Sequence, residues 1–227
     1  MNILSYSLYN NKTVLLHEDK KLIGKTIYDD FIIKNETFIV IDLIESRLSF
    51  FLDKKCIKIY TIACGHQKTP SPIGIWKIVY KSKDWGDGFG SRWMGLDVPW
   101  GIYGIHGTNN PRSIGYSISH GCIRMKNEDI EELFDLVPYN TLVIITGGSY
   151  GNLGNAFRTL MPGDRNSHVV EVQKRLKNLG YYAGSIDGIY GESLKKATIQ
   201  FKTDNRLLIS DVIDDETYKK LGIILFE

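Results

Sequence analysis

A cysteine and two histidines lie in two short segments of the chain, residues 105–108 and 119–125. Cys122 follows His120 by two positions and His106 by sixteen. A thiol is a useful nucleophile only as its thiolate, and a neighbouring imidazole that accepts its proton makes this form available near neutral pH. These residue types therefore predict acyl transfer through a thioester on Cys122.

Either histidine is a candidate for the base. His106 reaches the cysteine if two adjacent strands or a loop bring the segments together, whereas His120 points to the same side as Cys122 if the backbone between them is extended. Gly121 allows a tight turn beside the nucleophile. It also allows a substrate to approach the backbone amides of Gly121 and Cys122, which we expect to stabilise an oxyanion.

The other two cysteines are expected to be inert. Cys56 and Cys64 lie in apolar runs, where a cysteine is usually a small buried hydrophobe. We expect Cys122, with its polar and glycine-flanked surroundings, to have a lowered pKa and to be alkylated faster than these two. A zinc site is the alternative use of Cys122 with the two histidines, but neither a CxxC nor an HxxxH spacing accompanies them.

Residues 103–125 resemble the signature of the L,D-transpeptidases with a YkuD-type catalytic domain, in which a His-Gly pair precedes a Ser-His-Gly-Cys-x-Arg block. The resemblance extends to residues 63–65 and 69–74 upstream and to residues 127–145 downstream. It implies a mainly β catalytic domain, an antiparallel β-sandwich with one helix after the catalytic cysteine.

The resemblance also assigns roles to the site residues. Cys122 would be the nucleophile and His106 the base, and the carbonyl of Gly107 would orient the imidazole as a carboxylate does in a Ser-His-Asp triad. The backbone of His120, Gly121 and Cys122 would line an oxyanion pocket. The side chains of Ser119 and Arg124 would support this pocket. A purely structural role is an equal alternative for Arg124, because the five N–H donors of its guanidinium can tie loops together.

Three further residues are predicted to bind substrate: Tyr103, Trp93 and Arg92. Trp93 belongs to a glycine-rich segment, residues 85–100, whose indoles would either cap a substrate groove or belong to the core of the sheet domain. Arg92 would either bind a substrate carboxylate or face solvent, and solvent is the simpler expectation.

The activity implied by the resemblance is crosslinking of peptidoglycan stem peptides. The enzyme would release a terminal D-alanine, hold the third stem residue as a thioester and pass it to the side-chain amine of a neighbouring stem, without a metal or organic cofactor. Two alternatives stay open. With water as the acceptor, the protein would be an L,D-carboxypeptidase; without chemistry, it would be a wall-binding protein that kept the fold.

Residues 36–147 are expected to form the catalytic domain. Short runs of β-branched and aromatic residues separated by turn residues predict antiparallel strands, at residues 38–43, 48–52, 57–62, 75–80 and 141–146. A helix is predicted after the cysteine, with Asn127 as its cap and its end at Pro138. Residues 1–35 are a polar segment with no assigned function, which would form a hairpin or an extra strand.

Beyond a glycine-rich linker at residues 148–160, the pattern becomes helical. Residues 161–227 resemble a peptidoglycan-binding domain of three helices, through matches that include Gly163-Asp164 and Asp187-Gly188-x-Tyr190-Gly191. The first helix is predicted from an apolar face of Val169, Val172, Leu176 and Leu179. Residues 210–215 lack a second Asp-Gly turn, so the chain departs from the family pattern there.

Composition excludes several other classes of function. A net charge of +2 over 227 residues does not favour nucleic-acid binding. Three cysteines do not make a disulfide framework, and no stretch reaches the roughly eighteen apolar residues of a membrane span. Residues 1–10 lack the pattern of a signal peptide. We therefore expect the protein in the cell wall, or in another extracytoplasmic or spore compartment that it reaches by a different route.

Overall fold

The computed structural model describes residues 5–9, 12–16, 37–147 and 157–223. The chain divides into two compact units, Met1–Gly151 and Asn152–Glu227. The strands of the first unit are β1 (Ser5–Tyr9), β2 (Lys12–Leu16), β3 (Thr37–Asp42), β4 (Arg47–Leu52), β5 (Lys55–Thr61), β6 (Cys64–Gly65), β7 (Gly74–Ser82), β8 (Trp93–Leu96), β9 (Tyr103–His106), β10 (Ser117–Ser119), β11 (Ile123–Arg124) and β12 (Leu142–Thr146). Its helices are the 3-10 turn η1 (Pro111–Ser113) and α2 (Asn127–Leu136).

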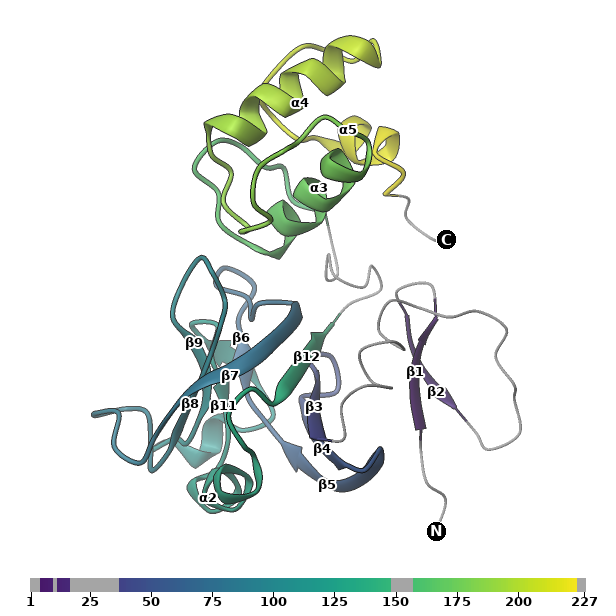
Figure 1. The fold of residues 1–227 in the computed structure, drawn as a ribbon. Helices are drawn as coiled ribbons and strands as arrows, with labels where there is room; N and C mark the ends of the chain where they lie inside the picture. The colour runs from purple at the N-terminus through teal and green to yellow at the C-terminus, as the bar shows by residue number, and fades with distance from the viewer. Residues whose placement is uncertain (1–4, 10–11, 17–36, 148–156, 224–227) are drawn as a thin grey trace. The chain divides into compact units, whose positions relative to one another are not determined.

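Eight strands form one curled sheet in the order β11-β9-β8-β7-β12-β3-β4-β5 (Figure 1). The predicted fold class, mainly β with one helix after the cysteine, is confirmed. The expectation of purely antiparallel pairing is wrong at two positions in this sheet, because β12 runs parallel to β3 and β11 parallel to β9. In both pairs the chain returns through a long connection, which parallel strands require.

The core of the first unit lies around the central strands β3 and β12. Ile39 and Ile41 of β3 are fully buried on one face, and Phe38 and Val40 on the other face belong to an apolar cluster. The remaining members of that cluster are Phe51, Leu142 and Ile144. Burial on both faces explains why these strands read as continuous apolar runs instead of alternating ones.

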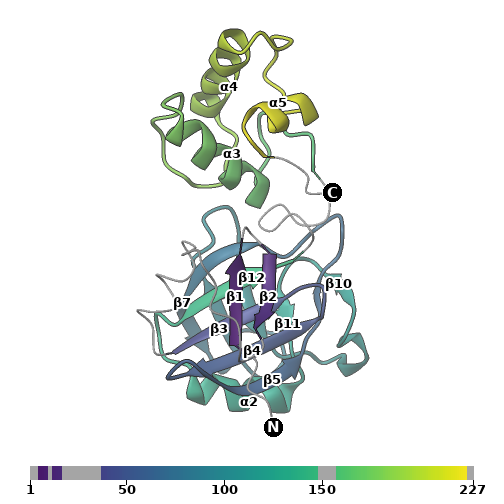
Figure 2. The same ribbon diagram turned by 90° about the vertical axis from the view of Figure 1, so that its right-hand side faces the viewer.

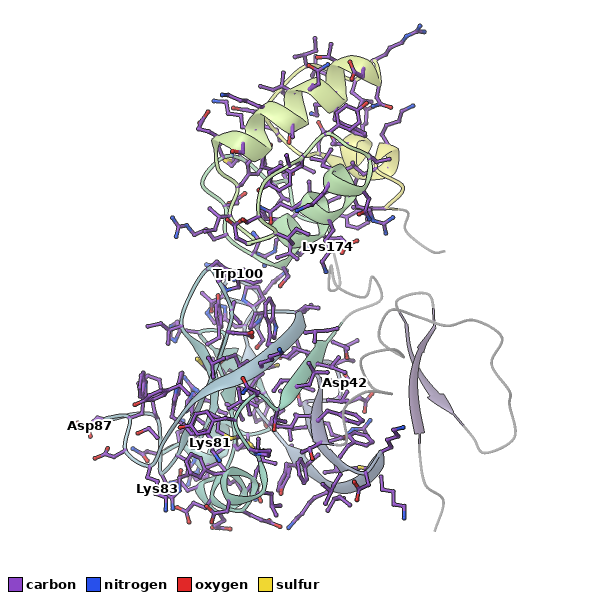
Figure 3. The ribbon with its side chains drawn as sticks, in the orientation of Figure 1. Asp42, Lys81, Lys83, Asp87, Trp100 and Lys174 are labelled. Atoms are coloured by element: carbon purple, nitrogen blue, oxygen red, sulfur yellow. The ribbon has the colours of Figure 1, made fainter. Side chains whose placement is uncertain are left out.

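Helix α2 packs against the sheet through Ile130, Leu133 and Phe134 (Figure 1). At its C-terminal end, the Lys81 ammonium of β7 donates to the carbonyls of Phe134 and Val137, at 2.5 and 2.6 Å (Figure 3). A cation at this end satisfies free carbonyls and complements the helix dipole. These contacts anchor the helix that follows the cysteine.

The predicted cap of α2 is corrected. The capping position is Lys126, and its side chain makes no capping hydrogen bond. Asn127 is instead the first helical residue, and its Oδ1 accepts a hydrogen bond from the Ser91 amide at 3.1 Å. Its side chain therefore ties the helix to the segment before β8. The helix ends at Leu136, close to the predicted stop at Pro138.

The second unit contains α3 (Ser167–Asn178), α4 (Glu192–Asp204) and α5 (Asp215–Lys220), visible in Figure 2. Their buried apolar residues form its core: Val169, Val172, Leu176, Leu194, Ala197, Phe201 and Tyr218. Leu179 was expected on the same face but is 53% exposed, because it is the C-terminal cap of α3 and lies beyond the last helical turn. Gly180 follows with a φ of +82°, a conformation that favours glycine.

Strands β1 and β2 pair antiparallel, with Ser5 opposite Leu16. The other residues of the predicted N-terminal segment, 1–4, 10–11 and 17–35, lie outside the described residues, as does most of the predicted linker, residues 148–156. In the described part of the chain, no helix has both the length and the apolar character that a membrane crossing requires.

Candidate active site

The pairing of β9 with β11 closes the sixteen-residue gap between His106 and Cys122. Ile123 lies opposite Ile105, and Arg124 lies opposite His106. Cys122 immediately precedes β11, and the same register places it beside Gly104. Opposed residues of neighbouring strands share a face of the sheet. Cys122 and His106 are therefore brought to one face by adjacent strands, which is one of the arrangements that the spacing allows.

His106 is held in one orientation at the end of β9. Its ring is 2% exposed, and its Nδ1 lies 2.5 Å from the carbonyl oxygen of Gly107. Because a carbonyl can only accept a hydrogen bond, Nδ1 carries the proton of the neutral ring and Nε2 is the basic nitrogen. The Gly107 carbonyl thus orients the imidazole, and the family resemblance implies the same role for it.

Burial keeps His106 uncharged. It lowers the pKa of the imidazole to about 4, and the positive charge of Arg124 acts in the same direction. Backbone hydrogen bonds with Gly107 and Phe89 oppose this shift without reversing it. Near neutral pH the ring is therefore uncharged, and its Nε2 carries no proton.

Aromatic rings enclose His106. The indole of Trp93 stacks on it with 5.5 Å between ring centroids, and the ring of Phe89 meets it edge-on at 5.1 Å. Trp85 stacks on Trp93 at 5.2 Å. Trp93 is 1% exposed, which agrees with the alternative that this indole belongs to the core of the sheet domain. It packs against the imidazole of His106.

Arg92 contacts helix α2. Its Nη1 lies 3.9 Å from Glu131 of α2, and its guanidinium lies over the Phe134 ring at 5.7 Å from the centroid. The side chain is therefore directed at α2, and it is 22% exposed.

The turn that carries the nucleophile is built around Ser119. This buried side chain donates through its Oγ to the Cys122 carbonyl at 2.6 Å and accepts from the Gly121 amide at 3.1 Å. Ser119 thus supports the turn through both of these hydrogen bonds. The Gly121 amide is engaged, however, so the amides of His120 and Cys122 are the remaining candidates for the oxyanion pocket.

Gly121 could not be replaced without cost. Its φ is +114°, and an added Cβ would lie 2.7 Å from Cε1 of the Tyr103 ring. Tyr103 therefore lies directly against the nucleophile turn. Burial raises the pKa of its phenol, and the charge of the Cys122 thiolate acts in the same direction.

Cys122 is a free cysteine whose Sγ lies 4.0 Å from the carbonyl oxygen of Ile102. Burial raises its thiol pKa, although a hydrogen bond with the Gly104 backbone and the charge of Arg124 counteract part of this effect. The expected lowered pKa is thus wrong. The resting pair is a neutral thiol and a neutral imidazole, and its proton must move during the attack.

The two histidines face different neighbours. His120 is exposed, and its ring lies edge-on to the ring of His66 at 5.9 Å between centroids. Within the described residues, no hydrogen bond links the Cys122 thiol to His106 or His120. Catalytic hydrogen bonds are often long in structures without substrate and tighten in the complex.

Arg124 lies beside the pair, and its charge acts on both His106 and Cys122. Its Nε is buried and has no hydrogen-bond partner in the described part of the chain. Its backbone pairs with Ala63 in both directions, at 2.8 and 2.9 Å. Arg124 thus combines an electrostatic influence on the site with a structural tie.

Sequence reasoning missed four residues around the site: His66, Thr69, Phe89 and Asn127. Thr69 and Asn127 fall inside segments that carry the family resemblance, so their positions were usable signals. His66 and Phe89 have none, because their contacts depend on the pairing of distant segments. No group of three or more histidine, cysteine or carboxylate side chains that could hold a metal ion occurs among the described residues.

Comparison with known proteins assigns the chain to a family. The sequence model of the YkuD L,D-transpeptidase catalytic domain matches residues 36–145, and that of a peptidoglycan binding domain matches residues 165–221. A Bacillus subtilis protein with the provisional name L,D-transpeptidase YqjB is 32% identical over 126 residues, which cover 49% of this chain and 72% of that protein. The chain belongs to the L,D-transpeptidase family. A second B. subtilis protein, provisionally named L,D-transpeptidase YkuD, is 41% identical over 107 residues, 47% of this chain and 64% of that protein.

A solved catalytic domain of an L,D-transpeptidase from E. faecium is 28% identical, with a TM-score of 0.43, and the match covers 49% of this chain and 98% of that one. The chain spans just under two thirds, 64%, of the length of YkuD from B. subtilis and of its B. licheniformis counterpart. The L,D-transpeptidase match falls on the unit that contains His106 and Cys122, and the peptidoglycan-binding match falls on the helical unit.

Proposed function

We propose that this protein is a cysteine L,D-transpeptidase that crosslinks the third residues of peptidoglycan stem peptides. Family membership supports the reaction class. The observation that carries the proposal is the pairing of β9 with β11, which brings an oriented neutral imidazole and Cys122 to one face of the sheet.

In the first half-reaction, the Cys122 sulfur attacks the carbonyl carbon between the third stem residue, a diamino acid, and the terminal D-alanine. The thiol proton passes to Nε2 of His106, because a neutral base is available there. The amides of His120 and Cys122 stabilise the oxyanion. When the carbon–nitrogen bond breaks, His106 returns the proton to the departing amine of D-alanine, and the stem is left as a thioester.

In the second half-reaction, the side-chain amine of a neighbouring stem attacks the thioester. His106 takes a proton from this amine, the carbon–sulfur bond breaks, and the proton returns to the Cys122 sulfur. The product is an amide between two third residues. Every proton is carried by His106, so these steps require no metal or organic cofactor.

The helical unit would keep the enzyme at its polymer. A module that binds peptidoglycan raises the effective concentration of the catalytic unit at the wall. Its support is the peptidoglycan-binding match over residues 165–221. An enzyme with this substrate and this anchor would act outside the cytoplasmic membrane or in a spore compartment.

The test is incubation of the full chain with purified disaccharide tetrapeptide, followed by mass analysis. Dimers that lack one D-alanine are the expected product. They should disappear in Cys122→Ala and persist in Cys56→Ala, which removes a thiol elsewhere in the same unit. Cysteine-dependent tripeptide monomers without dimers would replace the proposal with an L,D-carboxypeptidase. Unchanged tetrapeptide with the wild-type chain would overturn the enzymatic function.

A further inference from the structure

The turn at residues 66–69 is hydrogen-bonded to the turn that carries the nucleophile. It closes on itself, because the Thr69 amide donates to the His66 carbonyl at 3.0 Å. From it, the His66 amide donates to the Ser119 carbonyl at 3.0 Å, and the Thr69 hydroxyl donates to the same carbonyl oxygen at 3.2 Å. The Ser119 carbonyl thus receives two hydrogen bonds from one short segment.

The His66 side chain is fixed by the same turn. Its Nδ1 accepts from the Lys68 amide at 3.0 Å, so the ring proton resides on Nε2. Nε2 lies 3.2 Å from the Thr69 hydroxyl. Since the hydroxyl hydrogen is given to Ser119, the hydroxyl oxygen must accept from His66. The three bonds therefore run in one direction, from the Lys68 amide through His66 and Thr69 to Ser119.

This chain of bonds ends at the residue that shapes the nucleophile turn. Ser119 uses its carbonyl for the 66–69 turn and its hydroxyl for Gly121 and Cys122. The His66 ring also meets the exposed His120 ring edge-on, at 67° between the ring planes. His66 and Thr69 thus contact the turn both at its start, through Ser119, and at its exposed face, through His120.

We propose that His66 and Thr69 are positioning residues that set the orientation of the turn from Ser119 to Cys122, and with it the direction of the Cys122 sulfur and of the candidate oxyanion amides. Neither residue reaches the reacting atoms. The inference rests on the proposed function, since it concerns the same nucleophile. Small misplacements of reacting groups are costly in rate even when binding is unchanged.

Thr69→Val tests this, because it removes the hydroxyl and keeps the branched shape. We expect kcat for crosslink formation to fall about tenfold, the usual order for one lost hydrogen bond that orients a reacting group, with little change in KM. Thr69→Ser restores the hydroxyl and should return kcat to near the wild-type value. His66→Ala should lose about as much as Thr69→Val, and the double variant little more, because both break one chain of bonds.

Thr141→Val is the matched control. The Thr141 hydroxyl also donates to a backbone carbonyl in a turn, that of Pro138 at 2.8 Å, at the start of β12. This variant should change the melting temperature and leave kcat at the wild-type value. A wild-type kcat in Thr69→Val, or a loss in Thr69→Val that Thr69→Ser does not restore, would overturn the positioning role while the proposed function stands. A wild-type chain without crosslinking activity would instead overturn the function itself.

Discussion

The indole of Trp93 lies against the imidazole of His106, with 28° between the ring planes. The two residues are opposite each other in the antiparallel pair of β8 and β9. Trp93 therefore excludes water from one face of the His106 ring, which a solvent-exposed aromatic side chain would not do. The result is a histidine whose charged form is disfavoured by its surroundings.

His106 should make the stability of the catalytic unit depend on pH. Its pKa is about 4 in the folded state, against 6.5 for an unperturbed histidine. Between these values the unfolded chain binds a proton that the folded chain does not. The stabilisation is complete above pH 6.5 and is lost as the pH falls toward 4, with a total of about 3 kcal/mol.

Urea unfolding at pH 7 and pH 4.5 checks this, with the wild-type chain compared with His106→Gln. The wild type should lose more free energy of unfolding than the variant over this interval, since glutamine does not titrate. His120→Gln removes an exposed histidine and should follow the wild type. An identical pH dependence in wild type and His106→Gln would contradict the burial effect.

Sequence reasoning reached the strands, the helices and the cysteine site because each depends on local patterns. The apolar runs at residues 38–43 and 141–146 predict buried strands, but not that β3 and β12 pair in parallel. Asn127 has the composition of a cap, yet its side chain finds the Ser91 amide, which only the folded sheet brings near. The Gly121 amide was assigned to an oxyanion and is bound by Ser119 for the same reason.

Gly121→Ala should abolish most activity and lower stability. Two effects act together, since φ is +114° and the new Cβ would press on the Tyr103 ring. Gly115→Ala separates the backbone strain from the steric contact. Gly115 has a φ of +93°, but no atom lies within 4 Å of an added Cβ. It should cost about 1–2 kcal/mol of stability from the backbone strain alone and retain activity.

Thermal unfolding and crosslinking assays on the two glycine variants measure the difference. An equal loss of activity in both would mean that the contact of Gly121 with Tyr103 has no special importance for the nucleophile turn.

Lys202→Met should destabilise the helical unit. The Lys202 side chain is 1% exposed, and its ammonium lies 2.8 Å from the Ser210 hydroxyl and 3.0 Å from the Asp214 carboxylate. Removing it leaves Asp214 without its cation, at a cost of about 2 kcal/mol; this is below the cost for a fully buried pair because the Asp214 side chain is 40% exposed. Asp214 also caps α5 through the Thr217 amide, a bond that the variant retains.

Hydrogen exchange of the α4 and α5 amides in the full chain measures this loss directly. The control is Lys195→Met, whose more exposed ammonium lies 3.6 Å from Asp211 and should matter by less than about 1 kcal/mol. Equal protection in Lys202→Met and Lys195→Met would contradict a structural role for the pair of Lys202 and Asp214.

Cys122 should react slowly with simple alkylating agents at neutral pH and faster as the pH rises. Burial raises the pKa of its thiol, as it does for Cys56 and Cys64, so little thiolate exists at pH 7. Acylation by a substrate differs, because His106 takes the proton during the attack. His106→Gln should therefore reduce the rate of crosslinking by about a hundredfold or more, the range for a lost general base, and leave alkylation by iodoacetamide nearly unchanged.

Peptide mass analysis after timed iodoacetamide treatment gives the alkylation rate of each cysteine, and the crosslinking assay gives the other rate. Rapid alkylation of Cys122 at pH 7 that disappears in His106→Gln would contradict the neutral pair and indicate a preformed thiolate–imidazolium pair. The expected pattern, slow alkylation with strong dependence of crosslinking on His106, separates a base that acts during the reaction from one that has already taken the proton. Enclosure of the imidazole by Trp93 and Phe89 favours the first, since it disfavours a standing positive charge on the ring.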